Sequence, residues 1–412
     1  MARFDQTDLS QATPGACQDL LILDLSRILA GPTATQLLGD LGATVIKIEN
    51  PKSGGDDTRT WGPPYAETPD GESDLSAYYM AANRNKYSIA ADLSTPDGQA
   101  LVKSVAAQAD VVIENYKPGG LEKYGLDHAT LLSERPDLVY CSISGFGQTG
   151  PNRNLPGYDL MAQGFGGIMS LTGEPDGSPM KVGVGIADVV CGMYATVGIL
   201  AALRHRDATG QGQHIDLSLI DSQMAWLINE GTNFLASGTA PKRRGNAHPN
   251  IVPYDVFASS DGHIILAVGN DGQFQAFCKA MDRSDLSEDT RFLTNQARIA
   301  HRDALTAEIA ETLQRRTSAE ILQTLESLGV PAGPIHTVGQ ALGSSQAQAR
   351  SAVATVPAPQ TKEGAVKLLA NPLKLSQTPA TIRRAPPRFG QDTAQLNEIL
   401  KAHAAAKKAS RF

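Results

Sequence analysis

The sequence predicts an α/β protein with a large domain built on a doubly wound parallel sheet and a smaller α+β domain. Short apolar runs alternate with helical patterns through the first part of the chain, which is typical of a parallel sheet. After Asn250 the pattern changes to a hairpin followed by helices. With 412 residues, the chain also exceeds the size that one hydrophobic core usually supports.

The strands and helices of the large domain follow from its apolar periodicity. We expect buried strands at Leu20–Leu25, Thr44–Glu49, Val111–Glu114 and Leu138–Ser144. We expect helices at Thr33–Leu41, at about Ser94–Gln108, where Ser94 and Asp97 have capping-box spacing, and at about Asp127–Ser133. Because ligands of such sheets bind beyond the carboxyl ends of the strands, the expected binding loops are Ser26–Pro32, Asn50–Asp57, Asn115–Gly120 and Gly145–Pro151.

An apolar helix is predicted over Met193–Leu203, and it places the main candidate residue, Asp188. The basic run Arg204–Arg206 suits its carboxyl end, and small residues such as Gly192 suit close packing against a neighbour. Asp188 then lies at or just before the helix amino terminus, where free N–H groups and the helix dipole favour an ionised carboxylate. Asp188 is either a helix cap or a reactive carboxylate, and the residues alone leave both open.

Further elements complete the large domain and form the small one. His214–Leu217 reads as a strand and Asp221–Asn233 as a helix. In the small domain, strands at Val256–Ala258 and His263–Val268 flank the turn Ser260–Gly262, and helices follow at Gly272–Met281, Arg302–Leu313 and Ser318–Leu328, the last with a Thr317–Glu320 capping box. Weak strands are expected at Val366–Leu369 and Leu373–Ser376, a short helix from about Thr393, and a frayed end at His403–Phe412.

These elements predict the domain boundaries. Residues 1–225 form the first part of the large domain, 226–245 and 336–360 are linkers, 246–335 form the small domain, and 361–412 return to the large domain.

Composition excludes several classes of function. A net charge of −7 argues against a nucleic-acid partner. The 4 cysteines lack metal-binding spacing, which predicts no metal site and a reduced, intracellular protein. No apolar stretch is long and uninterrupted enough to cross a membrane, and Met1–Gly15 lacks a leader-like apolar run. We therefore expect a soluble, cytoplasmic protein with no membrane partner.

One motif resembles a dinucleotide-binding fingerprint. Gly145–Gly150 reads G-F-G-Q-T-G and follows a predicted strand. Pro151 follows at once, so no phosphate-binding helix begins where the fingerprint requires one. We predict a glycine-rich loop and no NAD.

Taken together, an ordered set of motifs resembles the class III coenzyme A-transferases, the family of formyl-CoA transferase and carnitine CoA-transferase. The motifs are Asp24–Arg27 with Ala30–Pro32, Leu38–Ala43 with Val45–Glu49, Asn83–Ile89, Glu114–Gly119, Gly145–Pro151, Gly157–Asp159, Ala187–Asp188, Thr209–Gln213 and Arg383–Pro387. Gly54–Pro64 and Ile251–Phe257 look most like the succinyl-CoA-dependent dicarboxylate branch, that of succinate–hydroxymethylglutarate CoA-transferase.

The resemblance implies a reaction and a site. Asp188 falls on the family's catalytic aspartate, which forms an aspartyl anhydride and then an aspartyl-CoA thioester. The implied partners are an acyl-CoA and a free carboxylic acid, with the CoA thioester as substrate, no tightly bound cofactor, and a second copy of the chain in an interlocked homodimer. The residues implied to bind CoA are Leu29, Ala30, Asp92, Leu93, Asn115, Tyr116, Lys117, Lys123, Tyr158 and Asp159.

Other side chains are candidates for supporting roles. Gly164, Gly166 and Gly167 either bring backbone N–H groups to a developing oxyanion or allow close packing. Leu29 stands where the formyl-CoA branch has a glutamine, so that polar group is absent. The candidates for binding the distal carboxylate of a dicarboxylate are Arg59, Arg243, Arg244 and His248.

Two other functions fit the same scaffold. An α-methylacyl-CoA racemase needs a base that moves an α-proton, and those enzymes carry histidine where this chain has Tyr158. A phenol is a weak base at neutral pH, which disfavours this alternative. A non-catalytic CoA-binding protein would have no use for the carboxylate of Asp188.

Overall fold

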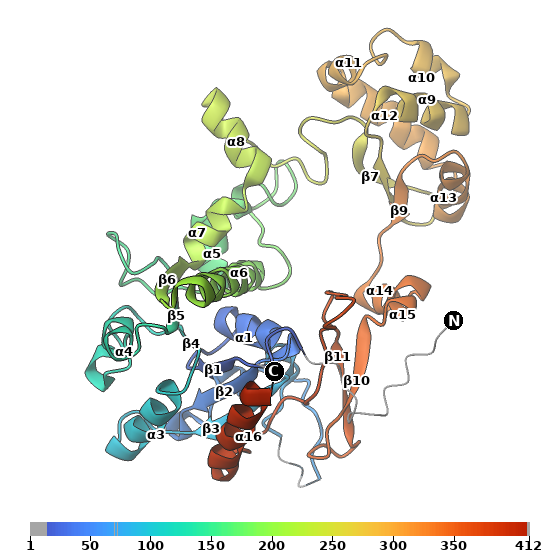
Figure 1. Ribbon diagram of the computed structural model, residues 1–412. Helices are drawn as coiled ribbons and strands as arrows, with labels where there is room; N and C mark the ends of the chain where they lie inside the picture. The colour runs from blue at the N-terminus through green and yellow to red at the C-terminus, as the bar shows by residue number, and fades with distance from the viewer. Residues whose placement is uncertain (1–14, 70, 72, 410–412) are drawn as a thin grey trace. The chain divides into compact units, whose positions relative to one another are not determined.

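The computed structural model describes residues 15–69, 71 and 73–409, and these form two compact units (Figure 1). Unit 1 takes the described residues up to Ile168, Lys181–Gly238 and those from Ser345 onward. Unit 2 takes Met169–Met180 and Thr239–Ser344, so the chain enters it twice. Met169–Met180 lies within residues 1–225, which the sequence assigns to the large domain. The leader peptide considered for the amino terminus falls almost entirely outside the described residues.

The centre of unit 1 is a parallel sheet. Within the described residues it has six strands in the order β3-β2-β1-β4-β5-β6. The strands are β1 (Leu21–Asp24), β2 (Thr44–Glu49), β3 (Lys86–Ala90), β4 (Val111–Glu114), β5 (Val139–Ser144) and β6 (Gln213–Ser218). Leu23 of β1 pairs with Ile46 on one side and Val112 on the other. Chain order therefore reverses between β1 and β4, which confirms the α/β prediction and places the switch point there.

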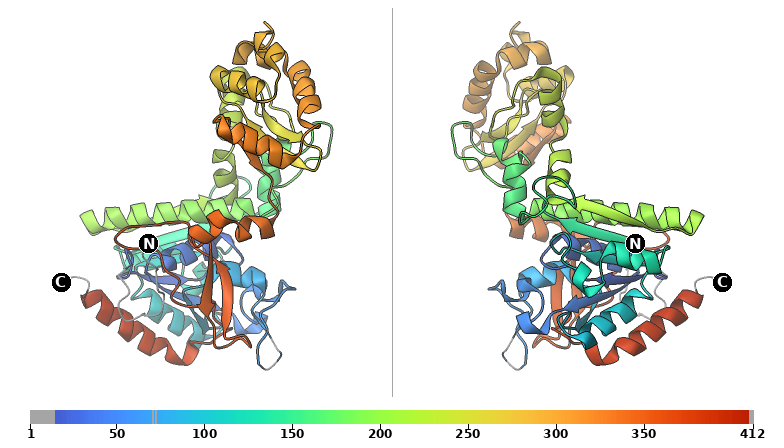
Figure 2. Two further views of the ribbon diagram at one scale, coloured as in Figure 1. Left: turned by 90° about the vertical axis from the view of Figure 1, so that its right-hand side faces the viewer. Right: turned by 90° about the vertical axis from the view of Figure 1, so that its left-hand side faces the viewer.

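Helices cover both faces of this sheet. On one face, α1 (Ala30–Asp40), α5 (Asp159–Phe165), α6 (Ile186–Thr209) and α7 (Leu219–Ala225) share a core with Ile22. On the other, α3 (Pro96–Ala106), α4 (His128–Glu134) and α16 (Leu396–Ala409) pack around Leu21 and Leu23. Figure 2 shows α6 and α16 on opposite sides of the strands. Leu21, Ile22 and Leu23 alternate between the two cores, as expected for a strand that is buried on both faces.

Helix α6 is apolar enough to need separate comment. Among the described residues it is the one helix that could cross a membrane by length and composition, contrary to the expectation from sequence. However, 56% of its most apolar window is buried inside the protein. A Cβ at Gly192 would lie 2.6 Å from the Ala30 carbonyl oxygen, so the helix packs directly against α1. Its small residues thus form a close helix–helix contact, and α6 is a core helix.

Several boundaries in unit 1 differ from the sequence expectation. The helix predicted over Asp221–Asn233 is two helices, α7 and α8 (Ile228–Ser237). Thr95, not Ser94, caps α3 by accepting the Gly98 N–H. Leu373–Ser376 forms no strand; instead β10 (Val353–Pro357) pairs with β11 (Ala365–Leu369) in an antiparallel hairpin. Helix α16 continues to Ala409, through most of the end that was expected to fray. Unit 1 also contains α2 (Ala77–Ala82), α15 (Ser345–Ala349) and the short 3-10 turns Pro51–Ser53 and Asp57–Thr60.

Unit 2 is the predicted small α+β fold. Strands β7 (Tyr254–Ala258), β8 (His263–Ala267) and β9 (Ala332–Pro334) form an antiparallel sheet. Its helices are α9 (Asp271–Ala280), α10 (Ser284–Glu288), α11 (Asn295–Ala300), α12 (Arg302–Leu313), α13 (Ser318–Ser327) and α14 (Val338–Gly343). Phe257, Ile264 and Phe277 belong to one core with residues of α12 and α13. The Thr317–Glu320 capping box is present as predicted.

Candidate active site

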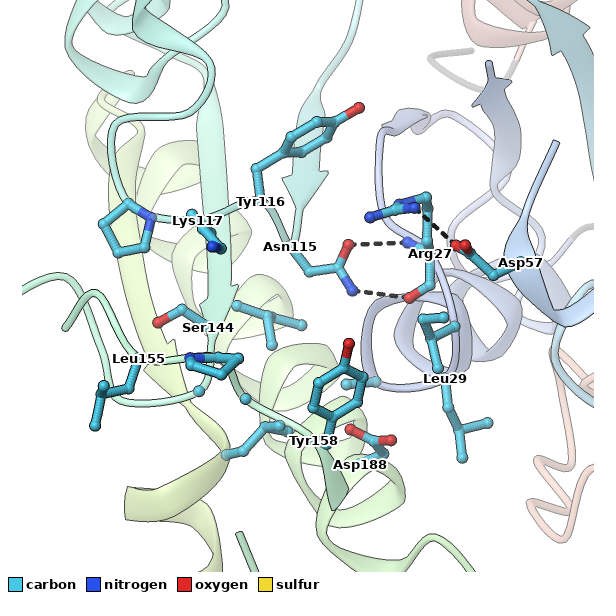
Figure 3. Close-up of a pocket in the computed structure, with 18 of the residues that line it drawn as sticks. Arg27, Leu29, Asp57, Asn115, Tyr116, Lys117, Ser144, Leu155, Tyr158 and Asp188 are labelled. Carbon is cyan, nitrogen blue, oxygen red and sulfur yellow. Dashed lines mark hydrogen bonds and ion pairs between the residues drawn. The ribbon is translucent and has the colours of Figure 1, made fainter. Parts of the chain in front are cut away.

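A cavity of about 310 Å³ lies at the carboxyl ends of the central strands of unit 1. Each of the four predicted binding loops contributes to its wall. The lining residues are Arg27, Ile28, Leu29, Ala30, Asp57, Trp61, Asn115, Tyr116, Lys117, Pro118, Ile143, Ser144, Gly145, Leu155, Pro156, Gly157, Tyr158, Asp188 and Leu219 (Figure 3). The cavity therefore sits at the topological switch point, where an open parallel sheet leaves room for a ligand.

The loops on the two sides of the switch point are hydrogen-bonded to each other. The Asn115 side chain, just after β4, accepts the Arg27 N–H at 2.9 Å and donates to the Arg27 carbonyl at 2.8 Å. The Arg27 guanidinium in turn pairs with Asp57 at 2.7 Å (Figure 3). This arrangement fixes the backbone at Arg27 while leaving about half of its side chain exposed (49%) at the cavity.

Asp188 is the third residue of α6 and faces the cavity beside Tyr158 (Figure 3). It is 8% exposed. The helix cap is Gly185, and the N–H groups of Ala187 and Asp188 donate to Asp159 Oδ1 at 2.8 and 3.4 Å. The alternative of Asp188 as a helix cap is therefore wrong, because Asp159 occupies the amino terminus of α6. Among the described residues, no donor hydrogen-bonds the Asp188 carboxylate.

Asp159 itself is anchored within unit 1. Gln163, one turn further along α5, donates to Asp159 Oδ2 at 2.7 Å and accepts the Val182 N–H at 2.8 Å. The aspartate thus bridges the start of α5 to the start of α6.

Burial and the neighbouring charge of Asp159 raise the pKa of Asp188 from its ordinary 3.8 to about 7. This is opposite to the sequence expectation that the helix terminus favours the ionised form. Burial outweighs the helix terminus here, and the N–H groups of Ala187 and Asp188 donate to Asp159. A carboxylate held with little solvation and no cationic partner is more basic than one on the surface, which suits it to attack a carbonyl carbon once ionised.

Two glycines bring the loops of the cavity wall together. A Cβ at Gly157 would lie 2.2 Å from the Gly145 Cα, so the G-F-G-Q-T-G loop packs directly against Gly157. Asp216 accepts the Gln148 N–H at 3.1 Å and holds the same loop to β6. The next helix, α5, begins only at Asp159, so the loop has no phosphate-binding helix behind it.

The structure distributes the residues predicted to bind CoA over three positions. Leu29, Ala30, Asn115, Tyr116, Lys117 and Tyr158 line the cavity, and Asp159 lies behind it at the start of α6. Asp92, Leu93 and Lys123 do not line it. Asp92 pairs with Lys52 at 2.9 Å, Leu93 is buried in the core around α3, and the Lys123 ammonium lies 4.8 Å from the Tyr124 ring centroid. The CoA contacts of all ten residues stay predictions.

Arg59, a candidate for binding a distal carboxylate, is a structural residue instead. Its guanidinium is 2% exposed and bonds Glu49 at 2.6 Å and Asp74 at 2.7 Å. It also donates to the Tyr79 hydroxyl at 2.6 Å. The assignment of Arg59 to substrate recognition is therefore wrong, because its charge is already neutralised inside unit 1.

The other candidates for that role lie in unit 2. Arg243 donates to the carbonyls of Glu174 and Gly177 at 3.2 and 2.6 Å. The His248 ring packs against Tyr254 with centroids 5.2 Å apart. Arg243 thus ties Met169–Met180 to the rest of unit 2, and a role for Arg243, Arg244 or His248 in substrate binding stays a prediction.

The glycines considered as oxyanion donors favour the packing alternative. Gly164, Gly166 and Gly167 do not line the cavity. A Cβ at Gly166 would lie 2.5 Å from Gln223 Cγ, so the position needs a residue without a side chain.

Arg27, Asp57 and Trp61 line the cavity but were not identified as site residues from the sequence. Arg27 and Asp57 stand inside motifs that carried the family resemblance, and both follow strands whose carboxyl ends were expected to bind ligand. Their position after these strand ends is the feature of the sequence that could have identified them as site residues. Among the lining residues, Arg27 and Lys117 are the cations. No group of His, Cys, Asp and Glu side chains in the described part of the chain is arranged to hold a metal ion.

Comparisons with known proteins identify the family of the chain. The family model for CoA-transferase family III matches residues 17–393. The chain is 47% identical over 391 residues to succinate–glutarate CoA-transferase of Agrobacterium fabrum, covering 95% of this chain and 96% of that protein. It is 38% identical over 397 residues to human succinyl-CoA:glutarate CoA-transferase, covering 96% and 88%.

A solved structure shows the same fold. The crystal structure of a CAIB/BAIF family protein from Brucella suis superposes with a TM-score of 0.83 at 46% identity, covering 94% of this chain and 100% of that one. These matches confirm the resemblance read from the motifs and its dicarboxylate branch. The chain belongs to CoA-transferase family III, and it is a CoA-transferase.

Proposed function

We propose that this enzyme moves CoA from succinyl-CoA to a second dicarboxylate, with glutarate as the first candidate, through covalent intermediates on Asp188. One observation carries the proposal. A buried carboxylate that has no hydrogen-bonding or cationic partner among the described residues faces a cavity at the switch point of the sheet. The names of the relatives, which act on succinyl-CoA or succinate and on glutarate, support the choice of substrates.

The reaction proceeds in two halves. The ionised Asp188 carboxylate attacks the thioester carbonyl of succinyl-CoA; the C–S bond breaks and leaves a mixed anhydride and CoA thiolate. The thiolate attacks the aspartyl carbonyl, which releases succinate and leaves an aspartyl-CoA thioester. The acceptor carboxylate then displaces the thiolate to give a new anhydride. Attack of the thiolate on the acceptor's carbonyl forms the product thioester and regenerates Asp188.

Substrate charge is matched by the cations of the cavity. CoA phosphates and the distal carboxylate of a dicarboxylate are anionic, and Arg27 and Lys117 are the cationic lining residues. Asn115 holds the Arg27 backbone, and the Arg27 side chain, which pairs with Asp57, is still 49% exposed, unlike that of Arg59.

A racemase is the alternative activity, and the cavity disfavours it. Tyr158 stands beside Asp188 where racemases of this fold carry histidine (Figure 3). Deuterium exchange at the α-carbon of 2-methylacyl-CoA, at a rate comparable to CoA transfer, would contradict the proposed reaction.

A homodimer and a cytoplasmic location belong to the same proposal. Helices α5, α6, α7 and α8 of unit 1 expose large apolar side chains, among them Phe165, Val197 and Leu235, the last 84% exposed. A surface of this kind is typical of an obligate interface, and the family resemblance implies a second copy as its occupant. Sedimentation of an active, folded monomer at low concentration would contradict it.

The function is tested by substrate preference and by trapping. Purified enzyme with succinyl-CoA should transfer CoA to glutarate and related dicarboxylates in preference to formate or acetate. Enzyme incubated with succinyl-CoA and then hydroxylamine should carry a hydroxamate at Asp188, and the Asp188→Asn variant should carry none. A clear preference for monocarboxylates would contradict the substrate assignment, and a missing label in the wild type would contradict the covalent mechanism.

A further inference from the structure

The backbone of Ile28, in the loop after β1, adopts a left-handed conformation. Its φ is +71°, a region that β-branched residues rarely occupy because their Cβ substituents crowd the backbone. Ile28 lies between Arg27 and Leu29, and all three line the cavity. Strain of this kind persists only where surrounding contacts impose it, and it is concentrated at functional sites.

A buried ion pair contacts the backbone of this loop. The Ile28 N–H donates to the two carboxylate oxygens of Asp56 at 3.3 Å each. Asp56 pairs with the ammonium of Lys47 at 2.9 Å, and both side chains are 0% exposed. The same ammonium donates to the Ser26 carbonyl at 2.9 Å. One ion pair therefore holds the backbone on both sides of Arg27.

Both members of this pair stay charged at neutral pH. Burial would raise the pKa of Asp56, but Lys47 and the hydrogen bonds of Thr58 lower it to about 2. Burial would likewise lower the pKa of Lys47, but Asp56, Asp24 and Glu49 outweigh it and raise the pKa. A buried ion pair is commonly no more stabilising than apolar residues of similar size, so its position beside a strained loop needs another explanation.

The loop also contacts the helix that carries Asp188. Leu29 follows Ile28 and is the cap residue of α1. A Cβ at Gly185 would lie 2.9 Å from Leu29 Cδ2, so Leu29 packs against the cap of α6, three residues before Asp188. A change of backbone conformation at Ile28 would displace Arg27 and Leu29 in the wall and disturb this contact.

We propose that Lys47 and Asp56 are positioning residues, which hold Ile28 left-handed and thereby set Arg27 and Leu29 in place for binding acyl-CoA. The inference rests on the proposed role of the cavity as the acyl-CoA site. Neither residue lines the cavity, so both act through the loop.

The first test compares two substitutions at one partly exposed position. Ile28→Gly permits the left-handed backbone without strain, whereas Ile28→Pro forbids it and removes the N–H. Both remove the isoleucine side chain, so the difference between them isolates the backbone. Titration calorimetry with CoA should give Ile28→Pro an affinity at least about tenfold weaker than that of Ile28→Gly, because the loss of the isoleucine side chain is common to both. The KM for succinyl-CoA should follow the same order.

The second test is a double-mutant cycle with Asp56→Asn. Asp56→Asn should weaken CoA binding about tenfold in the wild-type background and less when combined with Ile28→Gly, because glycine adopts the left-handed conformation without strain. Asp40→Asn is the matched control. Asp40 is also fully buried and paired, with Arg84 at 2.6 Å, but does not line or support the cavity, so its CoA affinity should be that of the wild type.

Three outcomes overturn the proposal. The first is equal CoA affinities of Ile28→Gly and Ile28→Pro. The second is wild-type CoA affinity in a folded Asp56→Asn variant. The third is an equal loss of CoA affinity on Asp56→Asn in the wild-type and Ile28→Gly backgrounds. The position 28 comparison stands even where Asp56→Asn does not fold. If wild-type enzyme bound no CoA, the proposed function would fail instead, so the two failures are distinguishable.

Discussion

Two regions of unit 1 bury carboxylates to a similar degree but surround them differently. At the ends of β1 and β2, Asp24, Glu49 and Asp56 lie among the buried cations Lys47, Arg59 and Lys86. These cations, with hydrogen bonds, lower the pKa of each carboxyl although burial alone would raise it. At the start of α6, Asp188 has a carboxylate, Asp159, as its charged neighbour, and its pKa is raised.

The comparison shows that burial alone does not determine what a carboxylate does. Carboxylates that are paired with cations stay ionised and can hold the backbone through hydrogen bonds, as Asp56 accepts the Ile28 N–H. An unmatched carboxylate retains reactivity, because no cation has to be displaced before it attacks a substrate. Asp188 lines the cavity itself, whereas Asp56 reaches it only through Ile28, whose N–H it accepts.

The largest expected effect is on catalysis at the unmatched carboxylate. Asp188→Asn should lower turnover by about four orders of magnitude or more, since no covalent intermediate can form. The fold and the affinity for CoA should be close to those of the wild type, measured by circular dichroism and calorimetry. Turnover near that of the wild type would show that Asp188 is not the nucleophile.

Breaking a paired carboxylate should instead reduce stability. Glu49→Gln leaves the buried Arg59 guanidinium without its closest counterion and should lower the free energy of unfolding by about 3 to 5 kcal/mol. Urea denaturation checks this. As a control, Lys362→Gln breaks the exposed Lys362–Glu67 pair and should change stability by less than about 1 kcal/mol. Equal effects of the two substitutions would remove the distinction between buried and exposed pairs.

Asp188→Asn should increase stability, whereas Glu49→Gln should lower it. Because the pKa of Asp188 is about 7 in the folded protein and 3.8 is ordinary, the folded state binds the proton more tightly than the unfolded state. Ionisation of Asp188 therefore lowers the free energy of unfolding. This loss grows as the pH rises from about 4 to 7 and is complete above about pH 7. Asp188→Asn should therefore stabilise the protein on the order of 2 kcal/mol at pH 8 and less at pH 5. A loss of stability at pH 8 would indicate a structural role for the carboxylate.

The smallest expected effect is a shift in the pH profile. Wild-type kcat/KM should rise with pH through about 7, as Asp188 ionises. Asp159→Asn removes the neighbouring charge but can still accept the Ala187 N–H, so the midpoint should move to lower pH by less than about one unit. A midpoint that is unchanged in Asp159→Asn would mean that Asp159 does not act on Asp188 through its charge.

The sequence predicted the features that depend on local pattern. Strands such as Thr44–Glu49 and Val111–Glu114 were placed to the residue, because short apolar runs in a βαβ order have one interpretation. The binding loops followed from the strand ends, and Asp188 from its place before an apolar helix. Strand β3 was not predicted, because it begins with Lys86; that lysine is buried with Asp24, Pro32 and Asn83 as its partners, and the first two are far away in the sequence.

Features that depend on distant pairing could not be predicted in this way. The Ala187 N–H at the start of α6 donates to Asp159 of a separate helix, so α6 alone left open whether Asp188 is a cap or a reactive carboxylate. Arg59 stands in a polar stretch that predicts exposure, yet Glu49, Asp74 and Tyr79 bury it. Such networks become visible only when the chain is folded.

The path of the chain through two units also sets an order of assembly during synthesis. Unit 2 ends at Ser344, whereas unit 1 needs residues from Ser345 onward. Those late residues close its early part: Asp392 accepts the Ser88 N–H at 2.9 Å, and the Arg383 N–H donates to Asn85 at 2.7 Å. As the ribosome makes the chain from its amino end, the small unit can be completed first. The β3 edge of the large unit lacks these contacts until Arg383 and Asp392 have been made, and an uncovered strand edge can pair with another chain.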